Sequence, residues 1–120
     1  PEIINCVIEN KISKLKIEWF KKTSITIVLC AKGYPSTYIK NSEIKNLSNL
    51  KNDINNQVFH AGTYERYNKV FSNGGRVLNV TTSSVDLNKA RLTCLKNIKK
   101  INWKEGFWRK DIGWRIIDKK

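Results

Sequence analysis

The chain has little acid, one histidine and no methionine, and these shortages narrow what it can do. Its 120 residues include 10 Asp and Glu against 23 Lys and Arg, with a single His60. The acidic residues are scattered, so no carboxylate pair is placed to hold Mg²⁺. His60 has no Cys, Asp or Glu at the spacing of a metal site. We therefore predict no metal site in this chain, and the absence of an initiating Met suggests a piece of a longer protein.

Cysteine pairs and long apolar runs are also missing. The three cysteines, Cys6, Cys30 and Cys94, contain no Cys-x-x-Cys pair, which argues against a disulfide framework and a zinc site. They are expected to be small core residues in a reducing cytosol. No apolar run approaches the roughly 20 residues that cross a bilayer, and the first residues do not resemble a signal peptide. We expect a cytoplasmic protein with no membrane partner.

Motifs for nucleotide binding and covalent catalysis are absent too. There is no Walker-type glycine loop ending in Lys-Ser/Thr and no strand-linked Gly-x-Gly-x-x-Gly. No nucleophile has a base at a recognisable spacing. We predict no catalytic residue, and the chain alone is not expected to be a complete enzyme.

The composition is that of one globular domain. Hydrophobic residues make up 40% of the chain, which has four each of Trp, Tyr and Phe. The net charge of +13 suggests nucleic acid or another anionic partner. Lys and Asn also rise together in genomes rich in A and T, so the charge has a purely compositional explanation as well. Both explanations stay open.

Hydrophobic periodicity predicts an α+β fold. An amphipathic helix is expected over residues 3–12, a half-buried strand over 15–19, and a central strand covered on both faces over 24–31. Further strands are expected at 58–61, 64–67, 70–71 and 76–81, with a weak one near Ile44 and a turn at Asn68 and Lys69. The mostly hairpin-type returns favour an antiparallel sheet or a small barrel-like sandwich.

One long helix is expected near residues 84–101. Ser83 or Ser84 is the predicted N-cap, with Asp86 in the first turn. Residues 109–115 are predicted to form a turn of helix and then a short strand. Trp19, Phe59 and Phe71 have apolar neighbours and are predicted to lie in the core.

Three glycine-marked loops, at residues 32–35, 60–63 and 73–76, each lie at the end of a predicted strand. Gly74 and Gly75 can take positive φ or let another group approach the backbone closely. The guanidinium of Arg76 fits a phosphate or carboxylate in bidentate fashion, and free N–H groups at the glycines form an anion nest if the loops converge. The candidate binding residues are Arg76, Gly75, Gly74, Lys32, His60, Gly62 and Thr63. The alternative is a plain hairpin turn with a solvated arginine, and loops that point in different directions.

Four segments occur in an order that resembles a known family. They are VLCAKGYP at 28–35, VFHAGT at 58–63, NGGRVLNVT at 73–81 and RKDIGWR at 109–115. Together they are similar to the C-terminal domain of phosphoribosylamine–glycine ligase, an ATP-grasp ligase of purine biosynthesis. Ser36 departs from the glycine that usually follows Gly-Tyr-Pro in this family, which leaves the tightness of that loop open.

The resemblance implies a function for the whole ligase. ATP activates glycine as an acyl phosphate, the amine of 5-phosphoribosylamine attacks it, and glycinamide ribonucleotide, ADP and phosphate result. ATP and Mg²⁺ or Mn²⁺ would bind in the ATP-grasp region, outside this chain. Residues 1–120 would then be a single domain that walls the substrate cleft, with the N-terminal and ATP-grasp domains as partners. Arg76 best matches a residue that holds the ribose phosphate, and Lys32 is second.

Two other hypotheses compete with this one. The first is a stand-alone basic domain that binds nucleic acid, which would require aromatic and basic side chains on one sheet face. The second is a split subunit that must pair with a separate ATP-grasp chain.

Overall fold

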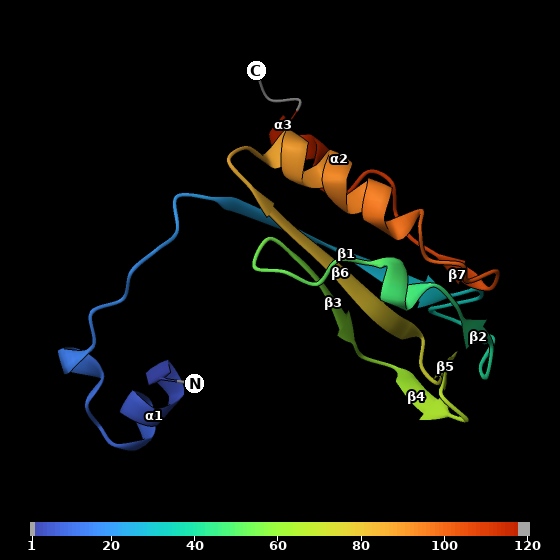
Figure 1. Cartoon of the computed structure of the whole chain (residues 1–120), viewed down its shortest axis with the longest axis horizontal. Coiled ribbons are helices and arrows are strands. Elements are labelled where there is room, and N and C mark those ends of the chain that lie inside the picture. Colours follow the sequence, from blue (N-terminus) through green and yellow to red (C-terminus); the bar gives the residue numbers. More distant parts are fainter. Residues whose placement is uncertain (1, 118–120) are drawn as a thin grey trace.

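Two antiparallel sheets and one long helix make up the fold (Figure 1). The computed structural model describes residues 2–117. Its helices are α1 (Glu2–Ile8), α2 (Leu87–Ile98) and α3 (Trp114–Ile117), with 3-10 turns at Ile12–Lys14 and Leu47–Asn49. Its strands are β1 (Thr23–Ala31), β2 (Glu43–Ile44), β3 (Asn56–His60), β4 (Thr63–Arg66), β5 (Lys69–Ser72), β6 (Arg76–Ser84) and β7 (Gly106–Phe107).

The larger sheet has the strand order β3-β6-β1-β7, and the smaller one has the order β2-β5-β4. β1 and β6 pair along almost their whole length, with Ile27 opposite Val80 and an irregularity between Leu29 and Cys30. β4 and β5 form a hairpin whose turn residues, Tyr67 and Asn68, both have positive φ. This is the geometry of a two-residue hairpin turn, one residue earlier than predicted. The α+β class with antiparallel sheets is confirmed, and neither sheet of the described residues closes into a barrel.

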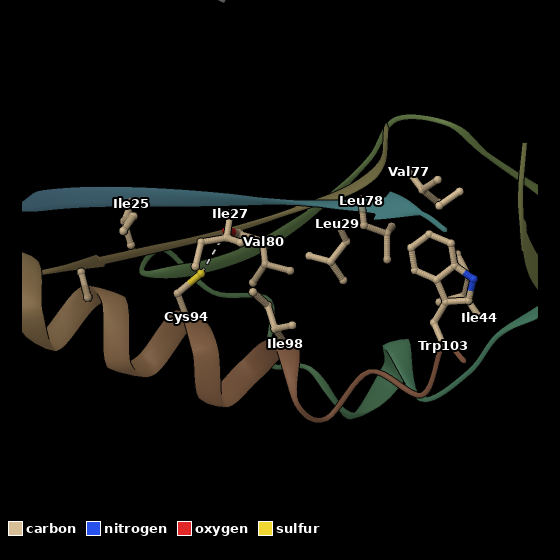
Figure 2. Close-up of a cluster of buried hydrophobic side chains, with 12 residues drawn as sticks. Ile25, Ile27, Leu29, Ile44, Val77, Leu78, Val80, Cys94, Ile98 and Trp103 are labelled. Carbon is tan, nitrogen blue, oxygen red and sulfur yellow. Dashed lines mark hydrogen bonds between the residues drawn. The ribbon is translucent and has the colours of Figure 1, made fainter. Parts of the chain in front are cut away.

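The core lies between α2 and one face of the larger sheet (Figure 2). Ala90, Cys94 and Ile98 on α2 pack against β1 and β6, and Trp103 and Ile44 extend the core beyond the end of the helix. The Cys94 thiol donates a hydrogen bond to the Val80 carbonyl at 3.2 Å. Burial raises the pKa of Cys94 to about 11, because the thiolate would lose its hydration there.

The prediction that residues 24–31 are covered on both faces is wrong. Ile25, Ile27 and Leu29 are buried, but Val28 between them keeps 36% of its surface exposed. α2 covers only one side of the sheet, so every second residue of β1 faces away from the core.

The N-terminal predictions fail in a related way. The first helix ends at Ile8, and residues 15–19 form no strand. No residue of α1 is buried, and Trp19 is 85% exposed. Phe59 is also exposed at 49%, while Phe71 is half-buried and stacks on Tyr64. The apolar pattern of residues 2–20 is present, but none of these residues is buried against the rest of the described chain.

Two helix ends differ from the predictions. Asp86, and neither Ser83 nor Ser84, is the N-cap of α2, and its carboxylate accepts a hydrogen bond from the Lys89 N–H at 2.7 Å. Both serines stay in β6 because they pair with β1. The predicted strand at the end of residues 109–115 is replaced by α3. None of the described helices is both long and apolar enough to cross a membrane.

Candidate functional site

The three glycine-marked loops meet at one end of the larger sheet. The Ala31 N–H donates to the Gly75 carbonyl at 2.8 Å, which ties the first loop to the third. The Asn73 N–H donates to the Gly62 carbonyl at 2.8 Å, which ties the second loop to the third. β6 lies between β1 and β3 in the sheet, so its first residues have the other two loops on either side.

Close backbone contact explains the glycines at this junction. A Cβ atom on Gly62 would lie 2.8 Å from Gly74 Cα, and a Cβ atom on Gly75 would lie 2.2 Å from Tyr34 Cδ2. Both distances are far shorter than an ordinary contact. The positive φ that was one possible reason for the glycine pair is absent, since only Gly33 and Gly113 among the described glycines have it.

Two backbone donors are free at this junction. Within residues 2–117, the N–H groups of Gly74 and Gly75 donate to no other group of the chain, but Gly75 is buried and packs against the Tyr34 ring. Free N–H groups beside a cation suit an anion. The half-buried Gly74 is the more accessible of the two, and an anion site at this junction stays a prediction.

Arg76 leaves this junction on the side of the sheet opposite α2, which we call the open face. Arg76 is exposed and stands opposite Cys30 in the ladder, and residues opposite each other in antiparallel strands share a face. Burial raises the pKa of the Cys30 thiol, and the nearby charge of Arg76 opposes part of that rise. The guanidinium thus lies close to Cys30.

The other predicted residues do not all join Arg76. His60 stands opposite Leu78, whose side chain is in the core. The His60 side chain is therefore on the side of the sheet that carries α2. Its Nδ1 lies 3.0 Å from the Thr63 hydroxyl. Lys32 is exposed, and its N–H donates to the Glu105 carbonyl at 2.8 Å. The structure brings the backbones of the candidate loops together but separates the His60–Thr63 pair from Arg76.

A second arginine reaches the open face. Arg109 lies at the edge of a largely apolar hollow of about 360 Å³. The lining residues are Thr26, Val28, Cys30, Tyr34, Pro35, Phe107, Trp108, Arg109 and Ile112. Arg109 donates from Nε to Asp111 Oδ1 at 3.0 Å and from Nη2 to Oδ2, and this pairing lowers the pKa of Asp111.

Sequence reasoning did not single out Arg109 as a candidate binding residue. The segment RKDIGWR was noticed as a family motif, and its two arginines were the available signal. Cys30 connects the two arginines, because it pairs with Arg76 and lines the hollow with Arg109. No group of three or more His, Cys, Asp or Glu residues within 2–117 is arranged to hold a metal ion.

Known proteins resemble this chain in sequence and in fold. The family described as "Phosphoribosylglycinamide synthetase, C domain" matches residues 24–115. Phosphoribosylamine–glycine ligase of Brucella melitensis is 33% identical over 117 residues, which cover 98% of this chain and 27% of that protein. The trifunctional purine biosynthetic protein adenosine-3 of Gallus gallus is 42% identical over 97% of this chain and 12% of its own length. A solved structure of phosphoribosylamine–glycine ligase from Thermotoga maritima aligns with a TM-score of 0.71 and 28% identity, over 91% of this chain and 27% of that one.

These matches give the class of the protein first: the chain is an α+β domain similar to the C-terminal domain of known ligases. More narrowly, it belongs to the phosphoribosylglycinamide synthetase C-domain family. The chain spans about a quarter of the length of the Brucella relative and of the Thermotoga structure.

Proposed function

We propose that this chain walls the substrate cleft of a phosphoribosylamine–glycine ligase. The observation that carries the proposal is the family match over residues 24–115, together with relatives that bear the ligase's name. In the proposed reaction, ATP activates glycine as an acyl phosphate and the amine of 5-phosphoribosylamine attacks it. Glycinamide ribonucleotide, ADP and phosphate are released.

In this proposal the domain holds the substrate and does no chemistry itself. The Arg76 guanidinium and the Gly74 N–H group bind the 5-phosphate of phosphoribosylamine, and the buried Gly75 shapes the loop that presents them. Arg109 stands on the same face as a second cation, and Lys32 stays a further candidate at the loop junction. A phosphate held by several charge-assisted donors is fixed in position, which keeps the amine of the substrate aligned for attack.

We place the ATP and Mg²⁺ sites in the preceding, ATP-grasp part of the ligase. The chemistry of this domain supports that placement, since the described residues offer cationic and N–H donors that suit a phosphate and no carboxylate cluster that suits Mg²⁺. The cytoplasmic location stays a prediction, as does the choice between one long ligase chain and a split subunit.

Arg76→Ala in the complete ligase tests the assignment. Losing one charge-assisted hydrogen bond costs about 1.5–3 kcal/mol, so the KM for phosphoribosylamine and the Kd for glycinamide ribonucleotide should both rise at least about tenfold. ATP affinity should stay the same. Arg66→Ala is the matched control, because Arg66 is an exposed arginine on the β4–β5 hairpin whose guanidinium donates a hydrogen bond to the Tyr67 hydroxyl and lies over the Tyr67 ring.

Unchanged binding of glycinamide ribonucleotide by the Arg76→Ala ligase would sink the assignment. A nucleic-acid-binding module is the competing function, and the relatives, which are ligases, give it no support. Titration with single-stranded DNA over a salt series separates the two, because a nucleic-acid binder would show a steep loss of affinity with salt.

A further inference from the structure

No helix or second sheet of the described residues covers the open face of the larger sheet, although Tyr34, Pro35, Trp108 and Ile112 line a hollow along part of β1. The side-chain positions of the open face follow from the strand register: Ser24, Thr26, Val28 and Cys30 on β1, Asn79, Thr81 and Ser83 on β6, Gln57 and Phe59 on β3, and Phe107 on β7. None of these ten residues is buried. α2 lies on the other side, where the core is (Figure 2).

The ten positions named above carry no charge in a highly charged chain, and the two arginines of the open face, Arg76 and Arg109, lie at its loop end. With 28% charged residues overall, a typical surface of ten residues would carry about three. Phe59, Phe107 and Val28 instead expose 49%, 39% and 36% of their surfaces. The centres of protein interfaces are depleted of charge and enriched in aromatic residues, so the open face has the composition of an interface centre.

Four hydroxyl side chains of this face already form hydrogen bonds with one another. The Ser24 and Ser83 hydroxyls lie 2.7 Å apart, and those of Thr26 and Thr81 lie 2.8 Å apart. Burying a hydroxyl is costly when it has no hydrogen-bond partner, but each of these four takes part in one hydrogen bond across the strands. One O–H donor of each pair is left over, so a partner that covers this part of the face has to accept hydrogen bonds from two hydroxyls and not from four.

The N-terminal arm, residues 2–22, is the second unpartnered apolar surface. Figure 1 shows it running away from the sheet towards α1. Its exposed side chains include Ile8 at 77%, Trp19 at 85% and Phe20 at 77%. A helix of seven residues such as α1 is too short to be stable in water without packing. The arm needs a surface to cover it.

The arm and the open face are continuous. Trp19 and Phe20 line a hollow of about 330 Å³ together with Ser24 and Ser83 of the open face. The family match begins at residue 24, yet the Brucella relative aligns over 117 residues of this chain and so also over most of the arm. The arm is therefore shared with whole ligases although it lies outside the C domain proper.

The opposite side of the domain differs in character. The exposed surface of α2 carries Lys89 and Lys96, followed by Lys99 and Lys100 just beyond the helix. Lysine is strongly hydrated and is depleted at interfaces. This side has the composition of a surface that stays in water.

We infer that the open face and the N-terminal arm together form the surface on which the preceding part of the ligase docks, while the outer face of α2 stays in water. We take the partner on this surface to be another part of the same ligase, because the Brucella ligase is nearly four times as long as the stretch it shares with this chain. The inference rests on the proposed function in taking that partner to be the ATP-grasp part. It also explains how Arg76 and Arg109 enter the active cleft, because both reach the open face at its loop end.

Oxidative footprinting of side chains tests the inference in the complete ligase and in this chain alone. Trp19, Phe20, Phe59 and Phe107 should be modified at least about threefold more slowly in the complete ligase, because an interface centre excludes water. Leu92, 57% exposed on α2, and Tyr67, 80% exposed on the hairpin, are the internal controls and should change little. Protection of Leu92 without protection of Phe59 and Phe107 would overturn the inference.

A pair of matched variants gives a second readout. Phe59→Glu places a charge on the open face, and Leu92→Glu places one at a similarly exposed position on α2. In the complete ligase, only Phe59→Glu should raise the footprinting rate of Phe107 and Trp19 towards that of the chain alone. Equal effects of the two variants would contradict the inference, provided that both variant chains unfold at the wild-type urea midpoint.

The footprinting test of this inference and the Arg76→Ala test of the proposed function can fail independently. Footprinting reads the docked surface whether or not the protein has ligase activity, and Arg76→Ala reads substrate binding whether or not Phe59 is covered. If the chain alone shows the protection of the open face, and this rises with its own concentration alongside a dimer in sedimentation, the occupant is a second copy and the inference is wrong.

Discussion

The contact between Gly75 and Tyr34 allows a quantitative test of the loop junction. A Cβ atom at position 75 would lie 2.2 Å from Tyr34 Cδ2 and 2.7 Å from Cε2. An ordinary carbon–carbon contact is about 3.5–4.0 Å, so the Tyr34 ring must move by more than about 1 Å to admit one methyl group. Overpacking of this kind costs about 1–3 kcal/mol. We therefore expect Gly75→Ala to destabilise the domain by about 2 kcal/mol.

The expected cost is carried by one aromatic ring, so a double-mutant cycle isolates it. Tyr34→Ala removes the ring, and the added methyl group of Gly75→Ala then has room. Gly75→Ala should cost at least about 1 kcal/mol less in the Tyr34→Ala background than in the wild type. Tyr34→Phe keeps the ring and is the control, so in that background the full cost should persist.

Urea unfolding measures each variant. With a slope of about 2 kcal/mol per molar urea, a loss of 2 kcal/mol moves the midpoint down by about 1 M. Strict additivity of Gly75→Ala and Tyr34→Ala would refute the reasoning, because it would mean that the Tyr34 ring does not exclude a side chain at position 75.

Three further predictions follow from single contacts. Burial raises the pKa of Cys94 to about 11 from the ordinary thiol value of 9.0. The stability that the protonated thiol contributes is therefore complete below pH 9 and is lost as the pH rises towards 11. In urea unfolding between pH 8 and 11, the wild type should lose up to about 2–3 kcal/mol more than Cys94→Ala, and equal losses in the two proteins would argue against this pKa. Asp86→Ala removes the cap on the Lys89 N–H and should cost about 1 kcal/mol, whereas Asp86→Asn should cost much less; equal losses for the two would show that the hydrogen bond is unimportant. Gly62→Ala should destabilise the domain more than Gly75→Ala, because its Cβ would meet the backbone at Gly74 and Arg76 and backbone yields less readily than a ring; the reverse order in urea unfolding would contradict this.

Several elements were predictable because their signals are local. The apolar face of α2, with Ala90, Cys94 and Ile98, follows from helical spacing alone. The ends of β1 and β3 follow from the glycines and Pro35 that come after them. The family resemblance rests on four short segments, and the match over residues 24–115 confirms it.

Other features lay beyond local patterns. Residues 15–19 alternate like a strand, but a strand needs a neighbour, and none of the described strands pairs with them. Asp86 is the N-cap of α2 in place of Ser83 or Ser84, because β1 extends far enough to keep both serines in the sheet. Such outcomes depend on partners that are distant in sequence.

By itself the sequence determined the class of fold, the family and the positions of the three glycine-marked loops, because residue spacing and turn-forming residues act over a few positions. Whether the three loops meet was left open by the sequence and was decided by the tertiary structure. Only the tertiary structure decided which candidate residues share a face. The register of β6 between β1 and β3 puts Arg76 on the open face and His60 on the opposite one, and a shift of one residue in a strand exchanges its faces. The tertiary structure also brought Arg109 to the open face beside Cys30, 79 positions away in the sequence, where no local pattern could have placed it.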